Sequence, residues 1–323
     1  MSVLVTGGAG YIGGHVVDAL LNAGRQVVVV DDLSTGRPDR IRGLPLVQVD
    51  VASPVAVDVL AGTITRWGVA SVVHLAARKR VDESMARPDW YHQQNVGGTE
   101  NVLAAMTRTG VGRLVFSSSA AVYGSPAGSL VDEDAPLAPV NTYGRTKVAG
   151  ERALAAAASA GIRSVALRYF NVAGAASPLL RDDEEANLVT IVLGRLARGE
   201  APQVCGTDYP TPDGTCVRDL VDVRDVAAAH LAALRVLEEA RRPATTEALN
   251  VGTGVGVSVR QVVDRLRALD ACDLPVQELP RRDGDPAAVV AAADRARTRL
   301  GWSAVHDADD VLRSAWSAAR PGR

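Results

Sequence analysis

The chain has 323 residues, of which 47% are hydrophobic and 22% charged, a composition typical of a soluble globular protein with one large or two closely associated domains. The 35 basic and 37 acidic side chains leave a net charge of −2, which argues against a nucleic-acid partner because nucleic-acid-binding proteins usually carry a basic excess. No apolar run approaches the ~20 residues that cross a bilayer and no signal peptide is visible, so we expect a cytoplasmic protein with no membrane partner.

The numbers and spacings of cysteine and histidine bear on disulfides and on metal binding. The three cysteines, Cys205, Cys216 and Cys272, are odd in number and widely spaced, which favours reduced thiols of a cytoplasmic protein over a disulfide framework. The five histidines are scattered without ligand spacing, so we predict no metal site.

Short β-branched runs alternate with longer helical patterns through the first half of the chain. The runs lie at residues 3–5, 27–30, 46–49, 72–75, 114–116 and 165–167. Near-continuous apolar strands separated by helices indicate a parallel sheet that is covered on both faces. The sequence therefore predicts an α/β fold with a doubly wound (Rossmann) parallel sheet.

A glycine-rich turn follows the first of these strands. Gly7, Gly10 and Gly13 lead into a helical pattern that ends near Gly24, and glycines in this place allow a pyrophosphate to approach the amides at a helix N-terminus. Asp31 ends the second strand, where a carboxylate binds ribose hydroxyls and repels a 2'-phosphate. We therefore predict a dinucleotide site that prefers NAD to NADP.

The third strand and the fifth end in further candidate residues. Asp50 and Val51 follow the third strand and are placed to meet the adenine. A serine cluster that ends in Ser119 follows the fifth strand, where open α/β sheets bind their ligands. Tyr143 and Lys147 then lie four residues apart on one face of a helix, and the ammonium favours phenolate at Tyr143. These residues predict a general base with a serine that aligns the reacting hydroxyl.

After about residue 171 the alternation stops. The stretch 171–214 carries glycines, prolines and an acidic run at 182–185 around one helical segment at 188–197, which indicates a smaller mixed α/β substrate-binding lobe. The helical pattern 223–237 and the strand-like run 248–251 return to the sheet. We predict a dinucleotide-binding domain of residues 1–171 with about 217–251, and a substrate lobe of 172–216 and 252–323.

Together the glycine turn 6–13, the serine stretch 116–124 and the segment 143–147 resemble the extended short-chain dehydrogenase/reductase family. Four further motifs resemble its UDP-hexose 4-epimerases in order and spacing, namely residues 168–174, 213–219, 250–254 and 281–285. The resemblance runs from residue 2 to about residue 302. It implies NAD-dependent interconversion of UDP-glucose and UDP-galactose, in which hydride leaves C4' and returns to the opposite face of a 4-keto intermediate.

The resemblance also implies a role for each matching residue. Ser119, Tyr143 and Lys147 are the catalytic residues: Tyr143 removes the 4'-hydroxyl proton, Ser119 orients that hydroxyl, and Lys147 holds the nicotinamide ribose and keeps the pKa of Tyr143 low. The cofactor residues are Gly7, Gly10, Tyr11, Ile12, Gly13, Asp31, Asp50, Val51, Leu75, Lys79, Asn95, Tyr143, Lys147 and Tyr169. The UDP-sugar residues are Ser119, Tyr143, Asn171, Asn187, Leu188, Arg218, Arg282, Asp285 and Val289.

Val289 bears on the choice of sugar. Related epimerases carry either a large tyrosine or a small residue at this position beside the sugar, and a small one leaves room for an N-acetyl group. We therefore expect that UDP-N-acetylhexosamines are also substrates. The resemblance further implies a homodimer through a helical bundle that includes the helix after Tyr143, whose alanine-rich stretch 153–160 permits close helix approach.

Several other functions remain open at this stage. A dehydratase of this family needs an acidic pair where this chain has Ala120 and Ala121, which argues against dehydration. A UDP-uronate 4-epimerase or decarboxylase is harder to separate, because the sequence does not reveal a carboxylate pocket. A non-catalytic NAD-sensing protein on the same fold would be expected to lose the tyrosine and lysine that this chain retains.

Overall fold

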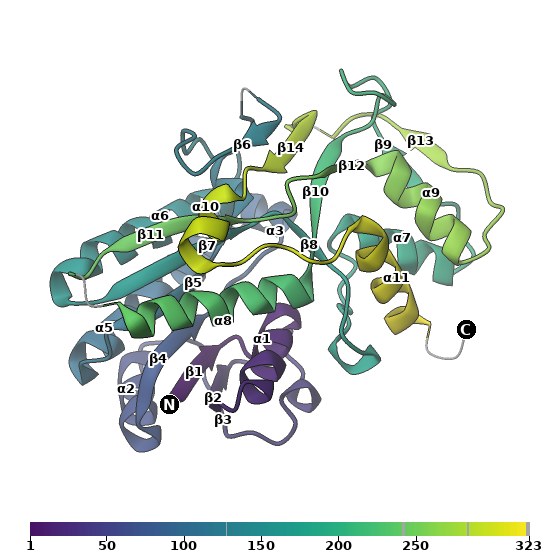
Figure 1. The fold of residues 1–323 in the computed structure, drawn as a ribbon. Coiled ribbons are helices and arrows are strands. Elements are labelled where there is room, and N and C mark those ends of the chain that lie inside the picture. Colours follow the sequence, from purple (N-terminus) through teal and green to yellow (C-terminus); the bar gives the residue numbers. More distant parts are fainter. Residues whose placement is uncertain (127, 241–242, 283, 321–323) are drawn as a thin grey trace.

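The computed structural model describes residues 1–126, 128–240, 243–282 and 284–320, and they form a large and a small lobe (Figure 1). The strands are β1 (Ser2–Thr6), β2 (Gln26–Asp31), β3 (Leu46–Gln48), β4 (Val69–His74), β5 (Arg113–Ser119), β6 (Leu130–Val131), β7 (Arg163–Tyr169), β8 (Asn171–Ala173), β9 (Gln203–Cys205), β10 (Val217–Asp222), β11 (Thr246–Val251), β12 (Gly256–Ser258), β13 (Gln277–Leu279) and β14 (Ala288–Ala291). The α-helices are α1 (Tyr11–Asn22), α2 (Ala56–Trp67), α3 (Val81–Ala86), α4 (Pro88–His92), α5 (Gly98–Thr109), α6 (Thr142–Ala157), α7 (Leu188–Ala197), α8 (Val223–Glu239), α9 (Val259–Leu269), α10 (Asp294–Leu300) and α11 (Ala308–Ala319).

The large sheet has the strand order β11-β7-β5-β4-β1-β2-β3, and every neighbouring pair in it is parallel. The order reverses between β1 and β4, which is the switch point where doubly wound sheets bind ligands at the carboxyl ends of their strands. The predicted α/β fold with a Rossmann sheet is therefore confirmed.

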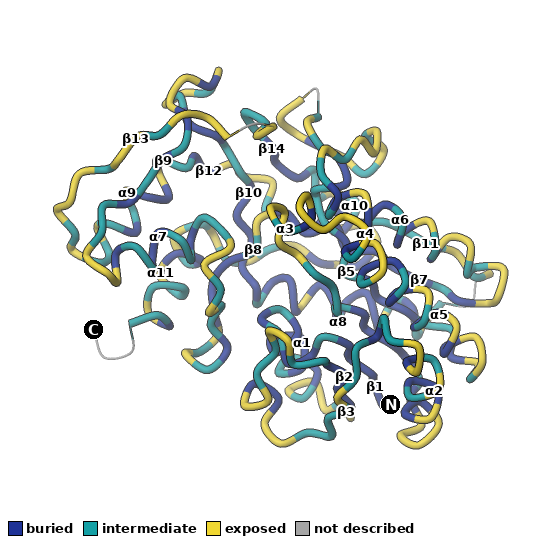
Figure 2. The backbone as a smooth tube through the Cα atoms, turned by 180° about the vertical axis from the view of Figure 1, so that it is seen from behind, coloured by how far each residue is buried: buried dark blue, intermediate teal, exposed yellow. Residues whose placement is uncertain are grey.

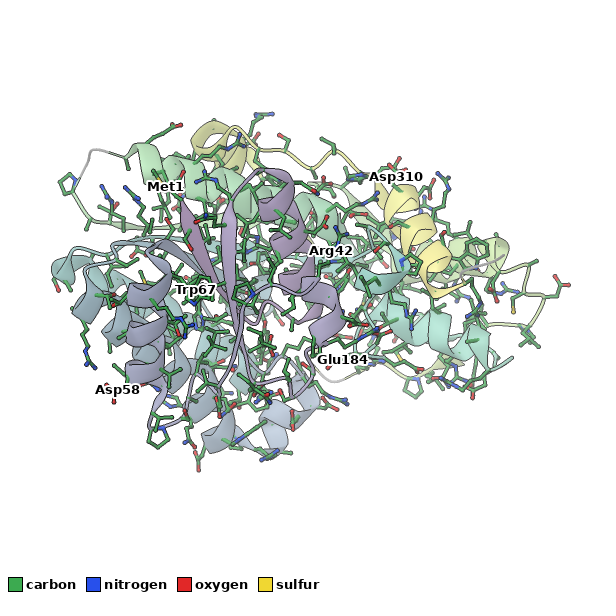
Figure 3. The ribbon with its side chains drawn as sticks, turned by 90° about the horizontal axis from the view of Figure 1, so that it is seen from below. Met1, Arg42, Asp58, Trp67, Glu184 and Asp310 are labelled. Atoms are coloured by element: carbon green, nitrogen blue, oxygen red, sulfur yellow. The ribbon has the colours of Figure 1, made fainter. Side chains whose placement is uncertain are left out.

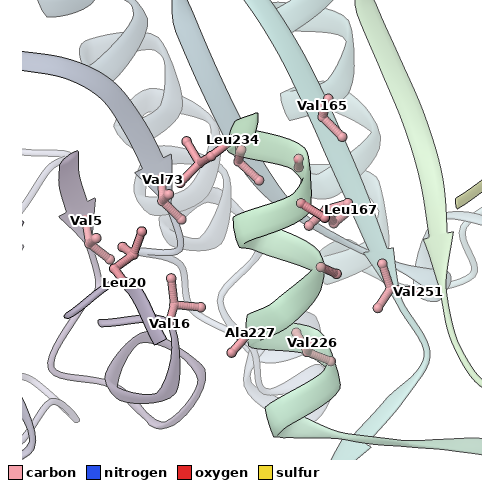
Figure 4. Packing of buried hydrophobic residues seen from close by; sticks show 14 of the residues in the cluster. Val5, Val16, Leu20, Val73, Val165, Leu167, Val226, Ala227, Leu234 and Val251 are labelled. Carbon is pink, nitrogen blue, oxygen red and sulfur yellow. The ribbon is translucent and has the colours of Figure 1, made fainter. Parts of the chain in front are cut away.

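Helices cover both faces of this sheet, because its strands are apolar on both sides. On one face, Val16 and Leu20 of α1 and Leu234 of α8 pack against Val5 and Leu167 of the strands (Figure 4). On the other face, α2, α5 and α6 enclose a second apolar cluster. Figure 2 shows that buried backbone follows the central strands, whereas the segment between α9 and β13 is exposed. Two closed apolar layers thus hold the strand ends in place.

The small lobe contains a mixed sheet in the order β12-β10-β14-β6, with β8 paired to β10. Strand β10 runs antiparallel to β12 and parallel to β14 and β8. Helices α7, α9 and α11 share a third apolar cluster beside it. The predicted mixed α/β lobe is therefore confirmed as part of the fold class, and the predicted helix at 188–197 is α7.

The residue boundaries of the two lobes stay a prediction. Strand β6 lies early in the chain but pairs with β14 of the small sheet, and α10 lies late in the chain but packs against α8 beside the large sheet. Among the described residues, no helix combines the length and the apolar character that a membrane span requires.

Candidate active site

The glycine turn joins β1 to α1 by a close backbone approach. A Cβ at Gly13 would lie 2.0 Å from the carbonyl oxygen of Gly7, so only glycine fits there. The amide of Gly7 donates to the carbonyl of Val30, and Gly10 precedes α1 without a side-chain cap. The amides at the start of α1 are therefore available to an anion, as a pyrophosphate requires.

Asp31 lies at the carboxyl end of β2 beside this turn and is 6% exposed. Its carboxylate accepts hydrogen bonds from the amides of Ala9 (3.0 Å) and Leu33 (2.9 Å). Burial raises the pKa of Asp31, and the two amides act against that rise. The carboxylate is thus fixed by backbone contacts at the end of β2.

One cavity extends along these strand ends. Its walls include Gly7, Gly10, Tyr11, Ile12, Gly13, Asp31, Asp50, Val51, Leu75, Lys79, Tyr143, Lys147 and Tyr169. Asn95 lies behind the wall, 4% exposed, where it pairs with the backbone of Arg78 and donates to the hydroxyl of Thr146. The structure therefore brings together the predicted cofactor residues, with Asn95 supporting the wall from behind.

Several polar residues of this cavity were not singled out by the sequence, and two of them carry charge. Arg78 and Asp32 both line it, and they form an ion pair. The guanidinium of Arg78 also donates to Gln94 and lies 5.3 Å from the ring centre of Trp90. Neither residue belongs to a spaced motif, so only their position after β2 and β4, the strands on either side of β1, could have indicated them. Arg37, by contrast, pairs with Asp39 and is not among the lining residues.

Helix α6 carries the tyrosine and the lysine. Asn141 caps the helix by accepting a hydrogen bond of 2.8 Å from the amide of Gly144. A Cβ at Gly144 would lie 2.5 Å from the carbonyl oxygen of Ala121, so glycine lets the start of α6 lie against the turn that follows Ser119. This close packing brings the side chain of Tyr143 to that of Ser119.

The hydroxyl of Ser119 lies near enough to the phenol of Tyr143 to act on its pKa. Burial raises the pKa of Tyr143, and the hydroxyl of Ser119 lowers it by less. The expected low pKa of Tyr143 is therefore not found in the ligand-free protein, because burial outweighs the effect of Ser119. Ser119 also accepts a hydrogen bond of 3.2 Å from the amide of Ala121, which fixes its side chain.

Lys147 lies one helical turn beyond Tyr143 and is 3% exposed. Its ammonium donates to the carbonyl oxygen of Ser117 (2.7 Å) and lies 5.7 Å from the ring centre of Tyr143. Burial lowers the pKa of Lys147 to about 8. Tyr169 closes the same wall, with its hydroxyl 2.7 Å from Nε2 of His230. The phenol of Tyr143, the hydroxyl of Ser119 and the ammonium of Lys147 thus meet near the carboxyl end of β5.

The predicted substrate residues of the small lobe are more dispersed. Arg218 of β10 pairs with Asp285 at 3.5 Å and donates to the carbonyl oxygen of Pro286. Val289 of β14 lies opposite Arg218 in register and packs with Phe170 and Val122 near the turn after Ser119. Arg218 and Val289 therefore share one strand pair, and Asp285 lies in the segment just before β14.

The remaining substrate positions lie apart from that strand pair. Asn171 begins β8 and is exposed, and Arg282 is exposed in the segment before β14. Asn187 caps α7 and donates to Asp182, and Leu188 packs into the third apolar cluster. The motif residue Asp283 lies outside the described residues.

An acidic loop at residues 181–185, between β8 and α7, forms ion pairs with residues of the large lobe. Asp183 pairs with Arg37 and with Arg40, whose guanidinium also donates to the carbonyl of Ala9 in the glycine turn. Glu184 pairs with Lys79 at 2.9 Å. Figure 3 shows Glu184 where this loop lies beside the N-terminal part of the chain. Ion pairs thus hold the small lobe at the edge of the cavity.

Comparison with known proteins agrees with this geometry. Residues 3–252 match the sequence profile described as "NAD dependent epimerase/dehydratase family". A curated UDP-glucose 4-epimerase of Azospirillum brasilense is 43% identical over 98% of this chain and 92% of its own length. A solved structure of UDP-glucose-4-epimerase from Stenotrophomonas maltophila, with bound NAD and formylated UDP-arabinopyranose, is 39% identical and covers 99% of this chain and 98% of its own, with a TM-score of 0.93. The UDP-Glc/GlcNAc 4-epimerase of Campylobacter jejuni is 34% identical over 98% of each chain, with a TM-score of 0.85.

Proposed function

The chain belongs to the NAD dependent epimerase/dehydratase family, and from this premise we propose that it interconverts UDP-glucose and UDP-galactose with NAD as its cofactor. The observation that carries the proposal is that Tyr143 and Lys147 line the same cavity as the glycine turn and Asp31. A base that accepts an alcohol proton therefore lies beside a site suited to a dinucleotide that accepts the hydride.

The walls of the cavity fit NAD. The free amides at the start of α1 suit its pyrophosphate, and the buried carboxylate of Asp31 suits a ribose with a free 2'-hydroxyl. Bound NAD supplies the group that takes the hydride from C4' and returns it. Because each turnover restores the oxidised cofactor, NAD stays with the protein between turnovers.

The side chains of this protein move the proton. Tyr143 accepts the proton of the sugar 4'-hydroxyl, which Ser119 orients, while C4' loses a hydride and becomes a ketone. The hydride returns to the opposite face of the sugar and Tyr143 returns the proton to the oxygen. Because burial raises the pKa of Tyr143, its deprotonation needs a positive charge nearby, and the ammonium of Lys147 supplies one.

The direct test is incubation of the purified protein with UDP-galactose without added cofactor, with products separated by chromatography. We expect UDP-glucose to appear, and Tyr143→Phe to lower kcat by about 10³-fold because a positioned acid–base group contributes that much. No epimer, even with NAD supplied, would contradict the proposal. Turnover of UDP-galacturonate instead would favour a uronate epimerase or decarboxylase, and NAD binding without any turnover would favour a sensor.

We extend the proposal to UDP-N-acetylhexosamines because of Val289. Its small side chain packs beside the turn after Ser119, where the sugar would lie. The similar protein of Campylobacter jejuni is a UDP-Glc/GlcNAc 4-epimerase. Val289→Tyr is expected to abolish turnover of UDP-N-acetylglucosamine while UDP-glucose is still epimerised. A wild-type protein that epimerises UDP-glucose but not UDP-N-acetylglucosamine would contradict this extension.

We also propose a cytoplasmic homodimer. The cysteines Cys205, Cys216 and Cys272 are unpaired thiols, which suits a reducing compartment. Helices α5 and α6 contact one another, and the exposed side chains of Ala155 and Ala156 would let a second copy pack closely against α6. Light scattering after gel filtration should give twice the 33.7 kDa mass of one chain. The mass of one chain would contradict the dimer.

A further inference from the structure

A third residue of α6 faces the catalytic strand end. Tyr143, Lys147 and Glu151 recur every four residues, so they share one side of the helix. The proposed mechanism uses the first two. Glu151 is 8% exposed and plays no part in the steps described so far.

The carboxylate of Glu151 ties α6 to two strands of the large sheet. It accepts a hydrogen bond from the hydroxyl of Ser118 at 2.5 Å and two from the guanidinium of Arg168, at 2.9 and 2.6 Å. Ser118 precedes Ser119 on β5 and lies opposite Arg168 of β7 in register. The carboxylate is therefore fixed directly behind the strand end that carries Ser119.

The guanidinium of Arg168 is also satisfied on its other side. It donates to the hydroxyl of Tyr123 at 2.9 Å and to the carbonyl of Glu133 at 3.2 Å, and Tyr123 donates to Asn250. A buried ion pair of this kind contributes little net stability, because two charges must leave water and apolar side chains could fill the same space. The pair therefore calls for an explanation other than the stability of the fold.

The neighbouring cation on the same side of α6 is Lys147, one helical turn before Glu151. Its ammonium contacts the carbonyl of Ser117 and lies 5.2 Å from the ring centre of Phe116, and neither neighbour is an anion. Burial lowers the pKa of Lys147 to about 8, and the carboxylate of Glu151 acts in the opposite direction. His74, on β4, is neutral near pH 7 because burial lowers its pKa to about 3.

On the basis of the function proposed above, we propose that Glu151 is a positioning residue: its carboxylate keeps the ammonium of Lys147 protonated and, through Ser118, holds the strand end that carries Ser119. Arg168 anchors this carboxylate and prevents it from turning toward Lys147 as a direct partner. Tyr143 and Tyr169 also face this region, and both carry phenols whose pKa burial raises. Without the carboxylate, Lys147 loses its proton at lower pH and Tyr143 becomes harder to deprotonate.

The test compares Glu151→Gln, Glu151→Asp and wild type as NAD-loaded enzymes. The fall of kcat at alkaline pH should begin about one pH unit lower in Glu151→Gln, since one unit is a modest charge interaction, and kcat at pH 8 should be about fivefold lower. The KM for UDP-galactose should change less than about twofold, because Glu151 does not touch the sugar. Glu151→Asp keeps the charge and should retain the wild-type limb.

Two further variants separate this role from folding. Glu151→Gln leaves Arg168 without its carboxylate partner, so the double variant Glu151→Gln with Arg168→Met removes both charges. Its alkaline limb should move in the same direction but by less, because loss of the guanidinium offsets part of the loss of the carboxylate. The control is Glu238→Gln. Glu238 lies on α8 and forms a bidentate pair with Arg25, which precedes β2 at the end of the sheet away from the cavity, so this variant should leave the pH profile unchanged. Wild-type limbs in both Glu151→Gln proteins, or a rise in KM that matches the fall in kcat, would overturn the proposal.

A spectroscopic titration distinguishes failure of this inference from failure of the proposed function. The absorbance of tyrosinate, taken as the difference between each protein and its Tyr143→Phe counterpart, reports the phenol of Tyr143 without any sugar. Titration of Tyr143 at higher pH in Glu151→Gln than in wild type would support the inference even if no sugar nucleotide is epimerised. Identical titrations would refute it even in an active epimerase.

Discussion

The glycine turn and the strand pair β10–β14 border the candidate site and are held by different forces. Gly13 lies against the carbonyl of Gly7 through backbone atoms alone, so steric exclusion sets its place. Arg218 and Asp285 are held by an ion pair between partly exposed side chains. In the proposed function, the dinucleotide would meet a turn whose shape is set by backbone contacts, whereas the sugar nucleotide would have to replace the ion pair of Arg218 with its own contacts.

The largest effect is expected where backbone meets backbone. In Gly13→Ala the new Cβ would lie 2.0 Å from the oxygen of Gly7, so the turn must open and unfolding should become easier by about 3 kcal/mol, at the upper end for overpacking. The purified protein should also carry little NAD. Chemical denaturation and cofactor content measure both. The matched variant Gly97→Ala adds a Cβ with no neighbour within 4 Å in helical backbone and should stabilise the protein by up to about 1 kcal/mol.

On the opposite wall, Arg218→Gln should weaken substrate binding rather than folding. Loss of a charge-assisted contact of about 2 kcal/mol raises the KM for UDP-galactose about 30-fold, with little change in kcat. Arg260→Gln removes a surface arginine of the same lobe that pairs with Glu278, and it should leave KM unchanged. A fall in kcat at constant KM would mean that Arg218 acts on the reacting atoms instead.

Acid should act on the dinucleotide side, because His74 and His230 are buried there. Burial lowers their pKa values to about 3 and about 4, below the ordinary value of 6.5. Between each folded pKa and 6.5, the unfolded protein therefore binds more protons than the folded protein. The stability that is present above pH 6.5 is lost as the pH falls toward the folded pKa. At pH 5 each histidine should lower the free energy of unfolding by about 2 kcal/mol, compared with its value above pH 6.5. His74→Asn should flatten the dependence measured by urea unfolding, whereas the exposed His92→Asn should not.

The smallest effect is expected at the acidic loop between the two walls. Asp183→Asn removes one carboxylate partner of Arg37 and of Arg40. The pair with Arg37 is partly exposed and contributes only about 0.2–1 kcal/mol, and the buried Arg40 keeps the carbonyls of Ala9 and Arg181 as acceptors. Release of NAD should therefore be a few times faster than in wild type at low salt and equal to it at high salt. Asp58→Asn, which breaks a surface pair with Arg108, provides the control. A difference that persists at high salt would contradict a purely ionic role.

Sequence pattern was sufficient for the large sheet because its strands are buried on both faces and therefore read as continuous apolar runs. Helix periodicity also identified α7 and α8. The pattern was weaker at helix ends: Ala23 follows the apolar spacing of α1 but is exposed beyond its last turn. The two-residue strand β6 pairs with the distant β14, and strands so short carry no periodicity.

The candidate site was predictable where a motif fixes a spacing. The glycine turn, Ser119, Tyr143 and Lys147 are of this kind. Glu151 and Arg168 are ordinary charged residues in sequence, and only their burial against each other distinguishes them. The pKa of Tyr143 was likewise beyond reach, because the effect of burial depends on which side chains surround the phenol in three dimensions.

Strand β10 lies in the small sheet along its whole length and runs directly into α8 of the large lobe. Val217, Arg218 and Asp219 pair with β12 of the small sheet, whereas the next three residues pair with β8 and lead directly into α8, which packs on the large sheet. The chain also crosses between the lobes where β6 pairs with β14 and where α10 packs against α8, so neither lobe is a continuous segment that could keep its contacts alone. Heating should therefore unfold the two lobes together in one calorimetric transition, as a single cooperative unit.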